Sequence, residues 1–340
     1  MRGYDPGKIG CYAGWRRYEG NPVIDERMGE VSDAAVLQED GHFRMYYSHR
    51  YLKKILLAAG EDGLEFRPYA DGAVTDEETD TKAYIVGSKF YDDGGDYGYT
   101  LTRRPELGWE AAVCQPYVLK QDGVYHLFYV GKRYSLQQED YDRTVIAHGV
   151  SRNGQNWKVE KTPVLEPDQL WEKDMLSYPS VLWDPEEKLY KMWYSGADAD
   201  KPSAIGYAVS QDAVTWRKPY TGPIFRKDNS TLERERVGAC HVLKWDGWYY
   251  MFYTAWQDEY KSRICLARSR DGVHDWERHP QNPVVTWGQF GAWDVESVCR
   301  PYALYMGNRW YCYYTGQARG QHRIGVLVHE GEDLGFGGGL

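Results

Sequence analysis

One pattern recurs along the whole chain and constrains its fold more than any other feature. Each copy contains an apolar run, a tight polar turn, an aromatic run, a loop and a run of small residues. The copy from Cys114 reads C-Q-P-Y-V-L-K-Q-D-G-V-Y-H-L-F-Y-V-G, and the copy from Gly238 reads G-A-C-H-V-L-K-W-D-G-W-Y-Y-M-F-Y-T. Asp-Gly between two apolar runs strongly favours a β-hairpin. A period of this kind indicates a repeat architecture.

Five copies align, and the first four end in a second turn that leads to Trp or Phe. The equivalent positions in the first run of each copy are Asp33, Gln115, Tyr178, Ala239 and Arg300. Units of about 60 residues with four short strands are typical of propeller blades. The sequence therefore predicts an all-β fold, a five-bladed β-propeller that forms a single domain over residues 1–340. The blade inner strands are expected to start near positions 33, 115, 178, 239 and 300.

Two segments depart from the regular repeat. The fifth copy lacks a fourth strand, and the run W-R-R-Y-E-G-N-P-V from Trp15 matches the run that begins at Trp276. We therefore predict that the N-terminal strand completes the last blade and closes the ring, which leaves no free blade edge. Residues 71–108 are interpreted as an insertion between the first and second blades.

Composition limits the classes of partner. The chain has 340 residues and a net charge of −9, which argues against nucleic acid. No apolar run approaches the roughly 18 residues of a membrane span, so no membrane partner is expected. The N-terminus carries no apolar leader, from which we expect a cytoplasmic protein. The six cysteines form no C-x-x-C pair, so no metal site, disulfide framework or cofactor is expected.

Aromatic residues with a polar group are abundant. The chain has 14 Trp and 30 Tyr but only 8 Phe. Such side chains suit β-sheet surfaces and also stack against sugar rings. The composition is therefore compatible with an oligosaccharide ligand, and it leaves the oligomeric state open.

The connections that lead into the first strand of each copy carry the candidate catalytic acids. Four residues before the aligned position, three copies have Asp174, Glu235 and Glu296, while the first copy has Asp33 at the aligned position itself. Converging inner strands would bring these acids to one funnel. Clustered carboxylates raise one another's pKa, which separates a general acid from a base. The alternative is that each acid is solvated or pairs with an arginine.

A second recurring acid is interpreted as structural. It occurs in the pairs Trp109-Glu110, Trp171-Glu172 and Trp293-Asp294, which precede three of the aligned strands. A residue type that recurs in each unit is expected to stabilise the unit, whereas functional residues usually lie in the connections that differ from one unit to the next. The connections that differ contain, among others, His49, Arg50, Lys132 and Trp256.

Several motifs resemble those of the five-bladed β-propeller glycosidases. They are N-P-V-I before Asp33 and the runs K-M-W-Y-S-G and I-G-Y-A-V-S between repeats. These glycosidases include glycoside hydrolase families 43 and 32 and relatives such as 117 and 130. Families 43 and 32 place an Asp at the start of the first inner strand, which Asp33 matches. Where family 43 has an Asp before Pro in blade three, this chain has Tyr178, and at the blade-four Glu it has Gly238.

The resemblance implies hydrolysis of a glycosidic bond, often in a furanoside or a pentose-containing oligosaccharide, in a pocket on the propeller axis. Asp33 would be the base or nucleophile and Glu235 the general acid. Asp174 would orient the sugar, and Glu296 is the alternative acid. The candidate substrate-binding residues are Arg50, Gln115, Tyr178, Arg236, His241, Trp256 and Arg300.

Two other functions remain open at this point. A phosphate-dependent glycoside phosphorylase, similar to family 130, would use a single acid. Its phosphate could bind to Arg50, Arg236, His241 and Arg300, because guanidinium groups suit bidentate phosphate binding. A non-catalytic carbohydrate-binding propeller would instead pair its acids with arginines. The fold alone does not decide between them, since propellers host unrelated functions.

Overall fold

The protein is described by a computed structural model that covers residues 6–25, 29–68, 99–198 and 201–337. Within these ranges the regular structure is β-strand, apart from two 3₁₀ turns, η1 (Pro6–Lys8) and η3 (Pro105–Leu107). The predicted all-β class is confirmed. No helix in these segments is long and apolar enough to cross a membrane. Most of the expected insertion at residues 71–108 lies outside the described residues.

Consecutive strands pair antiparallel, so the chain runs back and forth within each sheet. The first sheet has the order β2 (Val31–Glu39), β3 (His42–His49), β4 (Lys54–Gly60) and β5 (Arg67–Pro68), with β6 (Tyr99–Leu101) paired to β4. A later sheet has the order β16 (Arg236–Trp245), β17 (Trp248–Trp256), β18 (Ser262–Ser269) and β19 (Glu277–Arg278).

The middle of the chain forms a nine-stranded sheet. It contains two meanders, that is, two runs of consecutive antiparallel strands like those above. The first meander is β7 (Ala112–Gln121), β8 (Val124–Ser135), β9 (Asp140–Ser151) and β10 (Lys158–Val159). The second is β11 (Met175–Asp184), β12 (Leu189–Asp198), β13 (Lys201–Ser210) and β14 (Trp216–Arg217), with β15 (Phe225–Arg226) paired to β13. A single parallel pairing, of Met175 with Thr144, joins β11 to β9.

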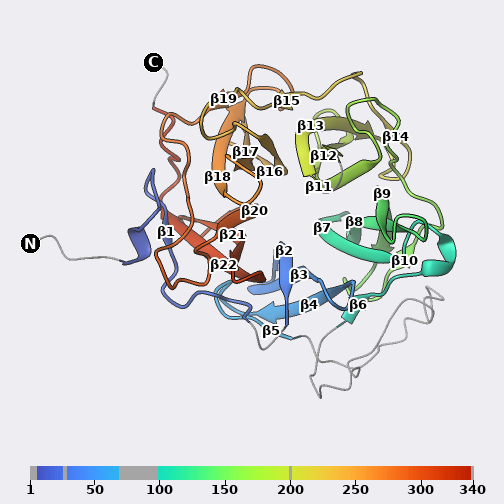
Figure 1. Cartoon of the computed structure of the whole chain (residues 1–340), viewed down its shortest axis with the longest axis horizontal. Helices are drawn as coiled ribbons and strands as arrows, with labels where there is room; N and C mark the ends of the chain where they lie inside the picture. The colour runs from blue at the N-terminus through green and yellow to red at the C-terminus, as the bar shows by residue number, and fades with distance from the viewer. Residues whose placement is uncertain (1–5, 26–28, 69–98, 199–200, 338–340) are drawn as a thin grey trace, which may run out of the picture.

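The last sheet combines both ends of the chain. It has the order β20 (Ser297–Met306), β21 (Arg309–Ala318), β22 (Gln321–Glu330) and β1 (Arg16–Arg17). In β1, Arg16 lies opposite Val328 of β22. Figure 1 shows the sheets around a common centre, with β2, β7, β11, β16 and β20 nearest to it. Neighbouring inner strands contact one another in this order, and β20 contacts β2.

Each inner strand is irregular at the same place. The aligned residues Asp33, Gln115, Tyr178, Ala239 and Arg300 have positive φ angles of 62°, 54°, 52°, 47° and 58°. Pairing with the second strand shifts register at each of these positions. A positive φ costs an L-residue about 1 kcal/mol or more, so the surrounding structure must hold it. A bulge of this kind changes the direction in which a strand side chain points.

Hydrogen bonds between sheets hold these positions. Four of the backbone N–H groups donate to a hydroxyl of the preceding sheet: Asp33 to Thr315 (3.2 Å), Gln115 to Ser48 (2.8 Å), Ala239 to Ser195 (2.9 Å) and Arg300 to Thr254 (2.9 Å). At the remaining position, Tyr178, the preceding meander of the same nine-stranded sheet has Val130 where the others have Ser or Thr. There the Gln115 Oε1 atom accepts from the Tyr178 N–H at 2.9 Å. Four bulges are therefore bonded to the neighbouring sheet, and the bulge at Tyr178 is bonded to the preceding meander of its own nine-stranded sheet.

A second repeated arrangement buries an acid beside four of the second strands. The acids Glu110, Glu172, Glu233 and Asp294 are at most 2% exposed. They accept hydrogen bonds from the hydroxyls of Tyr129, Tyr194, Tyr253 and Tyr314. They also pair with Arg104, Lys218, Arg278 and Arg17. The acids of the Trp–acid pairs thus each have a tyrosine and a cation as partners within the scaffold, as expected for structural residues.

The position of Arg17 supports the equivalence of β1 with the outer strands of other sheets. Arg17, Lys218 and Arg278 each come two residues after a tryptophan, at Trp15, Trp216 and Trp276. Each of the three cations pairs with the buried acid of its own sheet, at 2.7 to 2.8 Å. The N-terminal strand therefore supplies to the last sheet the same contact that a fourth strand supplies elsewhere.

The bonds between sheets can be tested at Thr254. We expect Thr254→Val to lower the free energy of unfolding by about 1–3 kcal/mol, because the Arg300 N–H loses its acceptor while the side-chain volume is kept. Urea unfolding measures the difference. Thr231→Val, at an exposed threonine, is the matched control and should change stability by less than about 0.5 kcal/mol. Equal stability of the two variants would contradict a role for this hydrogen bond.

Two buried histidines pack together in the first meander of the nine-stranded sheet. The Nδ1 atom of His126 lies 3.0 Å from Nε2 of His148, and the His148 ring lies 4.8 Å from that of Phe128. Burial, and then the neighbouring His126, lowers the pKa of His148 from 6.5 to about 3. Because the unfolded chain binds this proton more readily, the stabilising contribution of neutral His148 is complete above pH 6.5. It is lost progressively as the pH falls from 6.5 toward 3.

Acid stability should therefore depend on His148. We expect His148→Gln to flatten the dependence of the free energy of unfolding on pH by about 1 kcal/mol per pH unit below pH 6. Denaturant unfolding between pH 7 and pH 5 measures the slope. His42→Gln, at an exposed histidine, should keep the wild-type slope, and a wild-type slope in His148→Gln would refute the assignment.

Candidate active site

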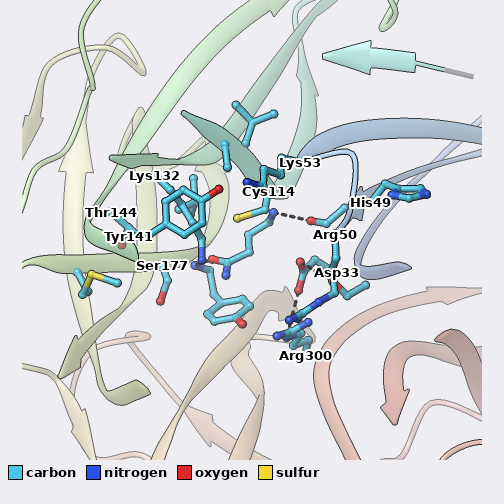
Figure 2. Close-up of a pocket in the computed structure, with 18 residues that line it drawn as sticks. Asp33, His49, Arg50, Lys53, Cys114, Lys132, Tyr141, Thr144, Ser177 and Arg300 are labelled. Atoms are coloured by element: carbon cyan, nitrogen blue, oxygen red, sulfur yellow. Dashed lines mark hydrogen bonds and ion pairs between the residues drawn. The ribbon is translucent and has the colours of Figure 1, made fainter. Parts of the chain in front are cut away.

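A pocket of about 330 Å³ lies where the inner ends of several sheets meet. Asp33 on β2, Gln115 on β7, Tyr178 on β11 and Arg300 on β20 all line it, and each is a bulge residue with positive φ. The same four residues, with Ala239, also line a smaller cavity of about 40 Å³. The repeated bulge therefore gathers side chains that are far apart in sequence (Figure 2).

Asp33 is the acid of this pocket. Its side chain is 7% exposed, and its Oδ1 atom lies 3.2 Å from Nε of Arg300. The Ser32 hydroxyl donates to Oδ2 at 2.9 Å. Oδ1 has no aligned hydrogen-bond donor among the described residues. Asp33 faces Arg300 directly in Figure 2, and it keeps acceptor capacity for a ligand.

Arg300 lines the pocket beside Asp33. Burial opposes its charge, yet Asp33 and Tyr178 outweigh burial and hold the pKa of the guanidinium above its ordinary value. The guanidinium carbon lies 5.6 Å from the centre of the Tyr178 ring. The buried Nη1 atom has no hydrogen-bond partner among the described residues. Arg300 is therefore a permanent cation with a donor available to a ligand.

Three more cations line the same pocket. Lys53 and Lys132 place their Nζ atoms 5.4 Å and 5.3 Å from the centre of the Tyr141 ring. Arg50 pairs with Glu30 at 2.9 Å. Among the described lining residues, four cations therefore accompany a single carboxylate. Such a pocket attracts anions.

Two predicted acids lie away from this pocket. The Asp174 side chain is 66% exposed and pairs with Arg143 at 3.3 Å. Glu235 is also exposed, and neither residue lines a described pocket. Both residues precede the first residue of their inner strand, so the bulge that turns Asp33 toward the axis does not act on them. The expected convergence of four carboxylates therefore does not occur in this pocket.

Glu296, Arg236 and Trp256 line a neighbouring pocket of about 390 Å³. This second pocket shares Tyr178 and Arg300 with the first. Glu296 accepts hydrogen bonds from the backbone N–H groups of Arg319 (2.7 Å) and Gly320 (3.4 Å). Of the predicted acids Asp174, Glu235 and Glu296, Glu296 is the one that lines a pocket adjoining that of Asp33.

His241 lines the small central cavity instead. Its Nδ1 atom accepts from the Ala303 N–H at 3.1 Å, and its ring lies 4.1 Å from that of Tyr302. Burial lowers the pKa of His241 from 6.5 to about 3, so the ring is neutral at pH 7. These contacts give His241 a packing role.

Among the pocket residues that the sequence analysis did not single out are Lys53, Tyr141 and Ser177. Lys53 lies in the connection between β3 and β4, and Tyr141 lies near the start of β9, next to the connection from β8. Ser177 directly precedes the aligned position Tyr178. The buried Ser177 hydroxyl has no hydrogen-bond partner in the described part of the chain. No group of three or more His, Cys, Asp or Glu residues in the described ranges is arranged to hold a metal ion.

Comparison with known sequences gives one partial match. No family model matches the chain. A 1,2-β-oligomannan phosphorylase of Thermoanaerobacter sp. (strain X514) is 30% identical over 135 residues. The match covers 36% of this chain and 43% of the length of that relative.

Comparison with solved structures shows the fold. A thermostable family-43 glycoside hydrolase has a TM-score of 0.66 at 14% identity, over 90% of this chain and 91% of its own. An exo-1,5-α-L-arabinanase from a bovine ruminal metagenomic library has a TM-score of 0.59 at 13% identity, over 91% and 95%. A xylan β-1,4-xylosidase of Bacillus halodurans C-125 has a TM-score of 0.63 at 14% identity, over 90% and 53%. The chain therefore has the fold of the family-43-type β-propeller glycosidases, which its repeats resemble.

Proposed function

We propose that the protein is a glycoside phosphorylase, which cleaves a glycosidic bond with inorganic phosphate, and that its sheets form a five-bladed propeller closed by β1. The blade count is supported by the five equivalent bulges, each bonded to the four-stranded meander or sheet that precedes it around the centre. Closure is supported by the pairing of β1 with β22 and by the ion pair of Arg17 with Asp294.

The observation that carries the phosphorylase proposal is the charge of the first pocket. Glycoside hydrolysis generally uses two carboxylates, about 5–5.5 Å apart for retention or about 6.5–9.5 Å for inversion. Phosphorolysis needs only one acid, because phosphate itself is the nucleophile. Among the described residues, this pocket offers the single acid Asp33 and the cations Arg50, Lys53, Lys132 and Arg300. Guanidinium and ammonium groups are the usual ligands of phosphate.

The proposed mechanism uses phosphate as the nucleophile and Asp33 as the general acid. Without phosphate, the Asp33 carboxylate is the partner of Arg300 at 3.2 Å. Phosphate bound by Lys53 and Lys132 would also reach Arg300 and replace Asp33 as its partner. A phosphate oxygen attacks the anomeric carbon, the glycosidic C–O bond breaks, and protonated Asp33 gives its proton to the leaving oxygen. The Asp33 carboxylate then regains a proton from the phosphate hydroxyl. The products are a sugar 1-phosphate and a shortened saccharide.

The partial sequence match is consistent with this proposal, because the relative is a phosphorylase. It acts on 1,2-β-oligomannan, so β-1,2-linked mannosides are the first substrates to test here. The reaction at the proposed site requires no cofactor.

Hydrolysis is the second candidate function. It is favoured by the position of Glu296 in a pocket that shares Tyr178 and Arg300 with that of Asp33, and solved structures with this fold include glycoside hydrolases. Asp33 would then activate water or attack the sugar, with Glu296 as the acid, on a furanoside or a pentose-containing oligosaccharide.

Turnover with and without phosphate separates the two functions. We expect purified protein to release a sugar 1-phosphate from β-mannosides, or from other oligosaccharides of a panel, only when phosphate is present. Asp33→Asn should lower kcat/KM by about 10²–10⁴-fold, because it removes the proton donor. Glu277→Gln, on β19 and outside both pockets, is the control. Turnover without phosphate would establish hydrolysis, and full activity of Asp33→Asn would refute the role of Asp33.

Phosphate binding gives a test that needs no sugar. We expect inorganic phosphate to bind the wild type in titration calorimetry, and Lys53→Met or Lys132→Met to weaken it by about 10-fold or more, as expected for a lost hydrogen bond to a charged group. Lys120→Met is the control, because this exposed lysine pairs with Glu39 outside the pocket. Absence of phosphate binding in the wild type would refute the phosphate site.

A further inference from the structure

The second pocket contains a buried cation that the proposed reaction does not use. Arg236 is 8% exposed and lines this pocket of about 390 Å³ with Trp256 and Glu296. Tyr178 and Arg300 form a common wall with the pocket of Asp33. A ligand in the second pocket would therefore lie next to the bond that Asp33 acts on.

Arg236 lacks a carboxylate partner among the described residues. Its Nη2 atom makes one long contact, of 3.5 Å, with the Glu259 carbonyl oxygen. Its Nε atom is buried and has no hydrogen-bond partner. Burial lowers the pKa of this guanidinium below its ordinary value, although the acids Glu235 and Glu259 oppose the effect. A buried, incompletely bonded cation is costly, and an anionic ligand would complete its hydrogen bonds.

Trp256 orients this guanidinium. The Arg236 guanidinium carbon lies 4.8 Å from the centre of the Trp256 ring, a cation–π distance. Strand pairing places Arg236 directly opposite Trp256. Trp256 is itself half-buried in the pocket wall. Indole rings form apolar platforms for sugar rings, so the pair offers an apolar surface and a charged group side by side.

The charge of the second pocket differs from that of the first. Its described lining includes the cations Arg236, Lys261 and Arg300 and the carboxylates Glu259 and Glu296. Burial, together with Arg300 and Arg50, lowers the pKa of His322 to about 2, so this residue adds no charge. Phosphate, with nearly two negative charges, is better matched by the first pocket, where the cations outnumber the single carboxylate. A carboxylate, with one charge, suits the second.

We infer that the second pocket binds the carboxylate of a hexuronic acid unit, through the Arg236 guanidinium, next to the glycosidic bond that is cleaved. This inference rests on the proposed function, because it places the uronic acid in the substrate of that reaction. A guanidinium binds a carboxylate through two parallel N–H···O bonds. Selection between an acidic and a neutral hexose then depends on whether these bonds are made.

Binding experiments test the inference without turnover. Titration calorimetry would compare the methyl glycosides of glucuronic, galacturonic and mannuronic acid with those of glucose, galactose and mannose. We expect at least one uronide to bind the wild type 10-fold or more tightly than its neutral counterpart. Arg236→Gln should abolish this preference, while Arg234→Gln should keep binding within twofold. Arg234 is a matched control, because it is exposed two residues away and its Nε bonds the Gln257 carbonyl oxygen.

Two results would overturn the inference. One is equal binding of each uronide and its neutral counterpart by the wild type. The other is a preference that persists in folded Arg236→Gln. If Arg236→Gln does not fold, Arg236→Lys is measured in its place, because lysine keeps the charge but lacks the planar guanidinium. Arg236→Lys should reduce the preference for the uronide at least threefold.

A competition arm separates this site from the phosphate site. Saturating inorganic phosphate should leave uronide affinity within threefold, because the two anions bind in different pockets. Displacement of the uronide by phosphate would overturn the assignment and make Arg236 part of the phosphate site. The uronide preference is measured without turnover, so it stands or falls independently of whether phosphorolysis is observed.

Discussion

The site depends on one backbone feature, the left-handed residue in each inner strand. Asp33, Gln115, Tyr178 and Arg300 reach one pocket because each occupies a bulge with positive φ. These conformations are unfavourable for L-residues. They are held by hydrogen bonds from neighbouring sheets, such as that from the Arg300 N–H to Thr254. The same hydrogen bonds between sheets therefore hold the sheets around the centre and fix the direction of the functional side chains.

The chemistry of such a scaffold then depends on which residues occupy the equivalent positions. Here one position holds an acid, Asp33, and another holds its cationic partner, Arg300. The residues at two further equivalent positions, Tyr178 and Ala239, are uncharged. Cations from the loops and second strands, such as Lys53 and Lys132, complete a pocket that suits an anion. A fold that also occurs in glycoside hydrolases thereby carries a pocket that suits the proposed use of phosphate.

Burial and hydrogen bonding separate two classes of acid in this protein. Glu172 and Glu233 are buried and have tyrosine and cation partners, so their bonds are used by the scaffold. Asp33 is also buried and lines the pocket, but one of its oxygens lacks an aligned donor. Asp174 is mostly exposed and pairs with Arg143. An acid that lines a pocket and is buried but not fully bonded is the better candidate for catalysis, because a ligand can complete its bonds.

The sequence by itself determined the all-β class, the repeat and the aligned positions, since hydrophobic alternation and Asp-Gly turns are local properties of the chain. It also pointed to Asp33, Arg300 and Arg50, which line one pocket. It placed Asp174 and Glu235 beside them wrongly, because a shift of a few residues from the bulge changes the direction of a side chain, and spacing alone does not reveal that direction. Only the tertiary structure decided that Lys53 and Tyr141 join Asp33 and that Arg236 lies in a neighbouring pocket. These groupings arise from contacts between sheets, which no local pattern encodes.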